Sequence, residues 1–327
     1  MDQEIEIGNS KPETFLSTPR GPIYHYTSQS GLLGILKNKH IWASHLRFLN
    51  DTREYLVGRA FIQRIHSLMR EIKQADETTT VLVDRLLSEV DRYDIYVASF
   101  AGADAGDSLD LWRGYARTTP GYSIGFSGEA LARAVASKTT DRPQLSLLRS
   151  VRYIPQLDNQ DKMRLELLPL ASLIRSLISQ LRQTHFDQLT DANEDFGDLV
   201  SAINKASQDY AKIEMFAALL LPLFKDEGFA SEQESRLVQV RAEHNRSEHR
   251  KYIDFHLGQS SIVPHVPIDL PSGDLGIIRI IVGPCPDPKW AVRAVEMLLD
   301  KYGVKVHRIE GDAGVEVVHS KIPYRNW

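Results

Sequence analysis

Cysteine is almost absent from the sequence, since Cys285 is the only one among 327 residues. A single thiol can form neither an internal disulfide nor a thiolate cage for a metal ion. Long hydrophobic runs are missing too: the longest, residues 215–224, is too short to cross a bilayer and contains Pro222. We therefore expect a cytoplasmic protein with no membrane insertion.

Positive charge is not in excess, because 39 lysines and arginines face 43 aspartates and glutamates. The formal net charge of -4 argues against a general polyanion-binding surface, although it leaves room for a local basic groove. Hydrophobic residues make up 42% of the chain and charged residues 25%, as in ordinary folded proteins. Nucleic acid is therefore a candidate acceptor and not a default partner.

The first third of the chain predicts strands and helices in alternation. Residues 1–22 are polar and mixed in charge, so we expect a flexible leader. Residues 23–27 have the character of a strand, and Ser28 or Ser30 can cap the helix that follows, with a second strand at 41–44. A longer helix is expected after residue 51, where Asp51 and Glu54 form a capping-box-like start.

The rest of the chain predicts a single elaborated α+β domain over residues 23–327. Helical periodicity over residues 160–224 predicts an inserted pair of helices, and residues 275–320 predict a C-terminal strand-helix-strand unit. Further strands are predicted at 95–100, 121–126, 145–153, 235–240, 252–257, 262–268 and 275–282. We expect the strands at 235–240, 252–257 and 262–268 to be successive antiparallel neighbours.

The stretch from Tyr24 to Thr27, followed by a helix and an aromatic-bearing strand, resembles the start of ADP-ribosyltransferase-fold proteins. The resemblance implies that His25 binds the adenosine ribose of NAD and that Tyr26 or Trp42 stacks on nicotinamide. A histidine beside two tyrosines is also typical of a core or turn residue, so both interpretations stay open.

A second stretch, Glu232-Gln233-Glu234, resembles the carboxylate pair that this superfamily carries on a later strand. By this resemblance Glu234 contacts the nicotinamide ribose, where a carboxylate stabilises the oxocarbenium character of glycosidic bond cleavage. Arg236 lies on the same face of the expected strand, so it either pairs with Glu234 or, like Arg47, lies near phosphate.

An ordered set of motifs extends the resemblance over most of the chain. The set comprises residues 24–27, 33–36, Phe48, Asn50, Asp51, Glu54, 99–100, 112–115, 121–126, 225–229, Glu232, Glu234, Arg236 and 320–325. Together these resemble the bacterial family called domain of unknown function 2971. The sequence departs from that pattern at Thr52, where proline is usual, and at Ser235, where tryptophan is frequent.

Other polar and aromatic residues are candidates for substrate binding. Asn50 and Glu232 could contact substrate, while Trp112 and Arg113 could recognise a base by stacking and cation–π contact. Core packing is the competing interpretation for Trp112. No histidine spacing fits a metal site on one helix face, so no metal is expected.

The sequence therefore predicts an α+β fold with a mainly antiparallel split sheet of the ADP-ribosyltransferase type. The leading hypothesis is an enzyme that uses NAD as a substrate, either transferring ADP-ribose to a protein or nucleic-acid acceptor or hydrolysing NAD. A bacterial stress or phage-defence effector is the expected setting. The alternative is a non-catalytic module that senses a nucleotide or nucleic acid.

Overall fold

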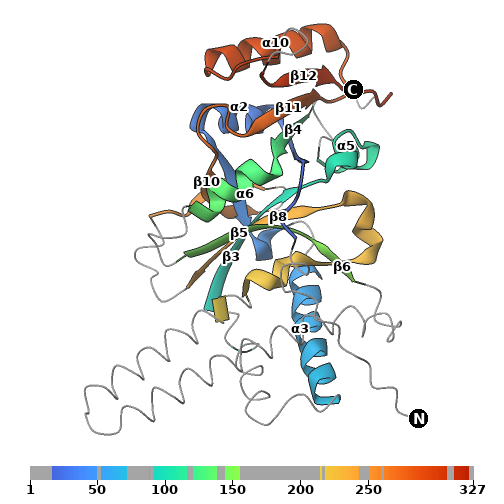
Figure 1. Cartoon of the computed structure of the whole chain (residues 1–327), viewed down its shortest axis with the longest axis vertical. Coiled ribbons are helices and arrows are strands. Elements are labelled where there is room, and N and C mark those ends of the chain that lie inside the picture. The colour runs from blue at the N-terminus through green and yellow to red at the C-terminus, as the bar shows by residue number, and fades with distance from the viewer. Residues whose placement is uncertain are drawn as a thin grey trace.

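The computed structural model describes residues 17–49, 53–71, 88, 92–115, 121–137, 144–154, 214–215, 218–242, 251–258, 261–307 and 313–323. These residues form a mixed α+β architecture in which most neighbouring strands are antiparallel (Figure 1). No helix in these ranges combines the length and apolar character needed to span a bilayer.

Two sheets make up the body of the protein. The smaller has the order β1-β4-β11-β12, with bounds Pro22–Thr27, Tyr122–Ser127, Ile277–Val282 and Glu316–His319. The larger has the order β5-β8-β3-β2-β10-β9, with bounds Gln144–Ser150, Ser235–Ala242, Tyr93–Phe100, His40–His45, Ile262–Asp269 and Asp254–Leu257. A parallel pair, β6 (Arg152–Ile154) and β7 (Phe224–Asp226), lies beside them.

The helices have bounds that match their local signals. They are α2 (Gln29–Asn38), α3 (Arg53–Glu71), α5 (Leu109–Tyr115), α6 (Gly128–Ser137) and α10 (Pro288–Lys301), with short 3-10 turns η1 (Leu46–Phe48), η3 (Ala103–Ala105), η4 (Leu221–Leu223) and η5 (Glu227–Glu232). Ser28 accepts from the Gly31 amide at the start of α2, and Asp287 caps α10 with Pro288 in its first turn.

Strand β3 links the two sheets, because the residue that follows it bridges to the smaller sheet. Its pairing with β2 consists of Ser44 with Val97 and His45 with Tyr96. Beyond that point β3 is followed by Ala101, which exchanges two backbone hydrogen bonds of 2.7 and 2.8 Å with Tyr24 of β1. The end of β3 therefore lies where the two sheets separate.

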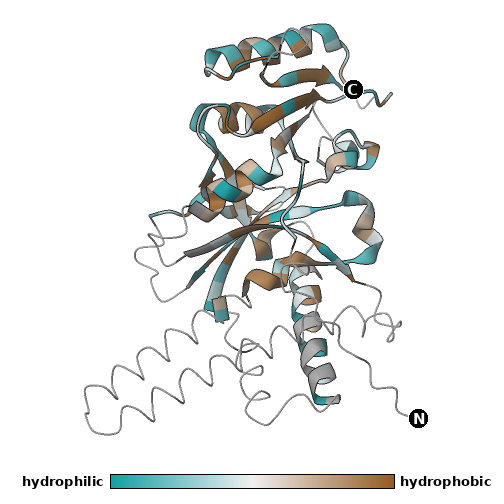
Figure 2. Ribbon diagram, in the orientation of Figure 1, coloured by the Kyte–Doolittle hydropathy of each residue, from teal (hydrophilic) through white to brown (hydrophobic). Residues whose placement is uncertain are grey.

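One connected hydrophobic core fills the space between the sheets and helices. It combines buried side chains of β3, β4, β10 and β11 with those of α2, α6 and α10. Alternation along β3 directs Ala98 and Phe100 into this core, so that Val97 and Ser99 face the other side of the larger sheet. Figure 2 shows the matching pattern of hydrophobic strands and mixed helices.

The structure confirms the α+β class and most of the predicted strands and helices. Two predictions are wrong in detail. Residues 145–153 form two strands, since β5 ends at Ser150 and β6 starts at Arg152. Strands β8 and β9 are not neighbours either: β8 lies between β5 and β3, and only β9 and β10 pair in succession. The predicted helical pair at 160–224 lies largely outside the described residues.

Candidate functional site

The two predicted carboxylates do not share a strand. Glu232 ends the 3-10 turn η5, and Gln233 then adopts a left-handed conformation with φ of 47° before β8 begins at Ser235. This turn corrects the expectation that Glu232 and Glu234 occupy alternate positions of one strand. It nevertheless leaves both carboxylates close to the same cation.

That cation is Lys225 of β7, whose Nζ lies 2.7 Å from Glu232 Oε2 and 3.0 Å from Glu234 Oε2. Arg236 of β8 completes the cluster by donating through Nε to Glu234 Oε1 at 2.7 Å and through Nη2 to Oε2 at 3.0 Å. Two cations thus meet two anions. We call Lys225, Glu232, Glu234 and Arg236 the ion cluster.

The ion cluster is buried except for one carboxylate. The side chains of Glu234 and Arg236 are 5% and 1% exposed, whereas that of Glu232 is 23% exposed. Arg236 Nη1 also donates to the Pro222 carbonyl at 2.7 Å, and the Glu234 amide donates to the Tyr153 hydroxyl at 2.7 Å. Buried charges require hydrogen-bond partners of this kind, and these bonds fix the geometry of the cluster.

Electrostatics keep both buried partners of this cluster charged. Burial opposes ionisation of Glu234, but Arg236 and Lys225 outweigh it and lower the pKa of that carboxyl to about 2. Burial likewise opposes the charge on Lys225, yet the carboxylate of Glu234 raises the pKa of the ammonium above its ordinary value. Glu234 is therefore an anion at any physiological pH.

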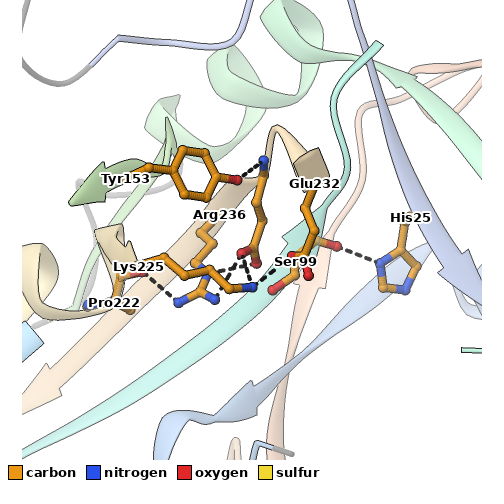
Figure 3. Close-up of polar contacts among 8 residues, drawn as sticks. His25, Ser99, Tyr153, Pro222, Lys225, Glu232 and Arg236 are labelled. Carbon is orange, nitrogen blue, oxygen red and sulfur yellow. Dashed lines mark hydrogen bonds and ion pairs between the residues drawn. The ribbon is translucent and has the colours of Figure 1, made fainter. Parts of the chain in front are cut away.

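His25 of β1 reaches the same place from the other sheet. Its Nδ1 lies 3.0 Å from the carbonyl oxygen of Ser99, which can only accept, so Nδ1 carries the hydrogen and Nε2 keeps a lone pair. Burial lowers the pKa of His25 and so favours the neutral ring, while the bond to Ser99 partly offsets this effect. Ser99 is also the cross-strand partner of Arg236, so this residue of β3 lies between His25 and the ion cluster. Figure 3 shows Ser99 between His25 and the Lys225–Arg236 side.

Tyr26 and Trp112 belong to a neighbouring aromatic group. The Tyr26 hydroxyl donates to the Ala105 carbonyl at 2.7 Å and accepts from the Ser108 amide, and burial raises its pKa to about 12. Its ring contacts Trp112 edge-on at 4.7 Å. Trp112 is 1% exposed and donates to Asp107, which places it in the core as the packing interpretation required.

Trp42 lies elsewhere on the larger sheet, among three histidines. It is 44% exposed, stacks on His256 at 5.3 Å and contacts His265 at 4.3 Å. Its Nε1 donates to His40 Nε2 at 3.2 Å. Trp42 and Ser99 both lie beyond the same end of the antiparallel β2–β3 pairing. Among the described residues, no contact joins Trp42 to the ion cluster.

The remaining candidates are dispersed. Arg47 lies over the ring of Tyr55 at 4.9 Å, and Arg113 is exposed on α5. Asn50 lies outside the described residues. In the described part of the chain, no group of three or more histidine, cysteine or acidic side chains is arranged to hold a metal ion.

Sequence reasoning missed Lys225, Ser99 and Tyr153 as members of the site. Lys225 and Ser99 were within the family-like pattern, but neither carried a chemical role. A buried lysine gives no local signal, because its partners Glu232, the last residue of η5, and Glu234, just beyond it, lie seven and nine positions along the chain.

Comparison with known proteins finds one family model that matches part of the chain. Residues 111–237 match the family described as protein of unknown function (DUF2971). The matched segment includes the whole ion cluster and Tyr153, while His25 and Ser99 precede it. This match supports the family resemblance without extending it to ADP-ribosyltransferases. No curated protein and no solved structure matches the chain.

Proposed function

We propose that this protein cleaves the nicotinamide glycosidic bond of NAD, as an ADP-ribosyltransferase-like enzyme or an NAD hydrolase. One observation carries the proposal: His25 bonds to the Ser99 carbonyl, and Ser99 is the cross-strand partner of Arg236, which binds Glu234. A ribose-binding group and a carboxylate close together are what the chemistry requires.

His25 has the state that ribose binding needs. The ring is held by its Nδ1 bond to Ser99, so Nε2 can accept a hydrogen bond from a ribose hydroxyl. Because burial lowers the pKa of His25, the ring stays neutral near pH 7 and keeps that lone pair. The role assigned to His25 thus agrees with its hydrogen bonding.

We propose that the carboxylate role is divided between two residues. Both oxygens of Glu234 are engaged by Arg236 and Lys225, so Glu234 holds the cluster together. Glu232 is more exposed and shares Lys225 with it. We therefore assign to Glu232 the contact with the ribosyl cation, and to Glu234 the positioning of Lys225 and Arg236.

The direct test is release of nicotinamide from NAD by the purified full-length protein. Glu232→Gln should reduce release by about a hundredfold, the scale of one lost electrostatic contact in a transition state. Glu316→Gln, which removes a carboxylate paired with Arg279 on β11, is the control and should retain activity. Wild-type protein that neither binds NAD in calorimetry nor releases nicotinamide would refute the proposal.

One observation favours the alternative, a nucleotide-sensing module without turnover. In the ion cluster two cations neutralise two carboxylates, so little uncompensated negative charge is left to stabilise a developing cation. A sensor of this kind would bind NAD with unchanged affinity in Glu232→Gln and release no nicotinamide. A protein or nucleic-acid acceptor is needed only if labelled ADP-ribose becomes attached to a macromolecule.

A further inference from the structure

A surface cavity at the far end of the molecule is unrelated to the ion cluster. It has a volume of about 490 Å³, within the range of small-molecule sites, and is lined by the first turns of α10 and by His319 of β12. Figure 1 shows α10 and β12 together at one end of the structure, with α3 at the other.

The cavity lies at the carboxyl ends of two parallel strands. β11 and β12 pair in parallel, and the last pair in their register is Val282 with His319. The chain leaves β11 at Val282 and enters α10 at Pro288, so the helix starts beside the same edge. Ligands of open sheets bind outside the carboxyl ends of parallel strands, where side chains of the connecting segments converge.

Trp290 supplies an aromatic face that folding does not use. It is 67% exposed, which is unusual for so large an apolar side chain, and it lines the cavity together with Pro288 and Val292. The fully buried side chains of α10 are Val295 and Leu299, and Val292 packs partly against the same core. An exposed indole beside a cavity is suited to stacking on a planar ring.

Cations flank this aromatic face. Lys289 and Arg293 line the cavity, and no described residue forms an ion pair with Lys289. Arg293 donates through Nη1 to Glu296 at 2.9 Å, which occupies one of its five N–H donors. The amides of the helix start contribute little, because Pro288 has no N–H and Asp287 already accepts from the Trp290 amide.

We propose that this cavity binds a nucleoside monophosphate, with the base stacked on Trp290 and the phosphate held by Lys289 and Arg293. An aromatic face and two cations fit a ligand that joins a planar ring to a dianion. Glu296 lines the same cavity, so its carboxylate opposes the phosphate and limits affinity.

Calorimetry with AMP, adenosine and inorganic phosphate tests each element of this site on the full-length protein. Trp290→Ala should weaken AMP binding at least tenfold, while Met297→Ala, at a position 59% exposed on the same helix, should leave it unchanged. Lys289→Gln should weaken AMP binding and leave adenosine binding unchanged. Glu296→Gln should strengthen AMP binding, an effect opposite to that of a merely disruptive substitution.

Absence of AMP binding would overturn the proposal, as would equal AMP affinity in wild type and Trp290→Ala. AMP is also part of NAD, so the titration is repeated with His25→Ala. AMP binding that is lost in His25→Ala and retained in Trp290→Ala would place the nucleotide beside Ser99 and contradict the cavity. Nicotinamide release is a separate measurement, so failure of one proposal leaves the other standing.

Discussion

The histidines around Trp42 make the stability of the larger sheet depend on pH. His265 is 1% exposed, and its Nδ1 lies 3.2 Å from Nδ1 of His256. Burial first, and then the proximity of His256 and His40, lowers the pKa of His265 to about 4, against an opposing effect of Asp254. We therefore expect acid to weaken the packing of β10 with β2 and β9.

The direction and size follow from proton binding. The unfolded chain has a histidine pKa of 6.5, so as pH falls it binds a proton before the folded chain does. The contribution of His265 is complete above pH 6.5 and declines as pH falls toward 4. For pKa values of 6.5 and about 4, the loss between pH 7.5 and pH 5 is about 2 kcal/mol.

Urea unfolding at pH 7.5 and pH 5 measures this difference. His265→Gln removes the titrating group, so the variant should lose about 2 kcal/mol less stability than wild type over that range. His319→Gln, at an exposed position of β12, is the matched control and should behave as wild type. Equal pH dependence in wild type and His265→Gln would refute the reasoning.

Two further predictions concern the effect of single substitutions on stability. Glu234→Gln leaves the charge of Arg236 buried without its anion and should lower the free energy of unfolding by about 3–5 kcal/mol in urea titrations; an unchanged midpoint would contradict the ion cluster. Gly125→Ala places a Cβ 2.8 Å from the ring of Tyr24 and should lower the free energy of unfolding by about 1–3 kcal/mol in thermal unfolding. The Cβ of Gly34→Ala meets nothing within 4 Å, so this variant should stabilise α2 by about 0.5–1 kcal/mol. Destabilisation by both substitutions alike would contradict this packing argument.

Local signals in the sequence were sufficient to predict many of the elements. Ser28 caps α2, and Asp287 with Pro288 starts α10, because a cap depends on residues within one turn of the helix. The alternation of side-chain types along the sequence likewise predicted strands β1 and β8. Such signals act over a few residues, so they specify elements and not the order in which strands pair.

The arrangement of the site depends on contacts that such signals do not contain. The left-handed turn at Gln233 was missed because no glycine marks it, and it separates Glu232 from the strand that carries Arg236. The position of β8 between β3 and β5 follows from long-range pairing. Only that pairing brings Ser99 beside Arg236, and thus His25 near Glu234.

The position of β3 between the two sheets also bears on how the protein unfolds. A strand that pairs with β2 and β8, and continues into the bridge with Tyr24, contributes hydrogen bonds to both sheets at once. Melting either sheet removes support from the other, because the shared strand loses its partners and the common core is opened. The two sheets therefore form one cooperative unit, and a single transition should report the unfolding of both.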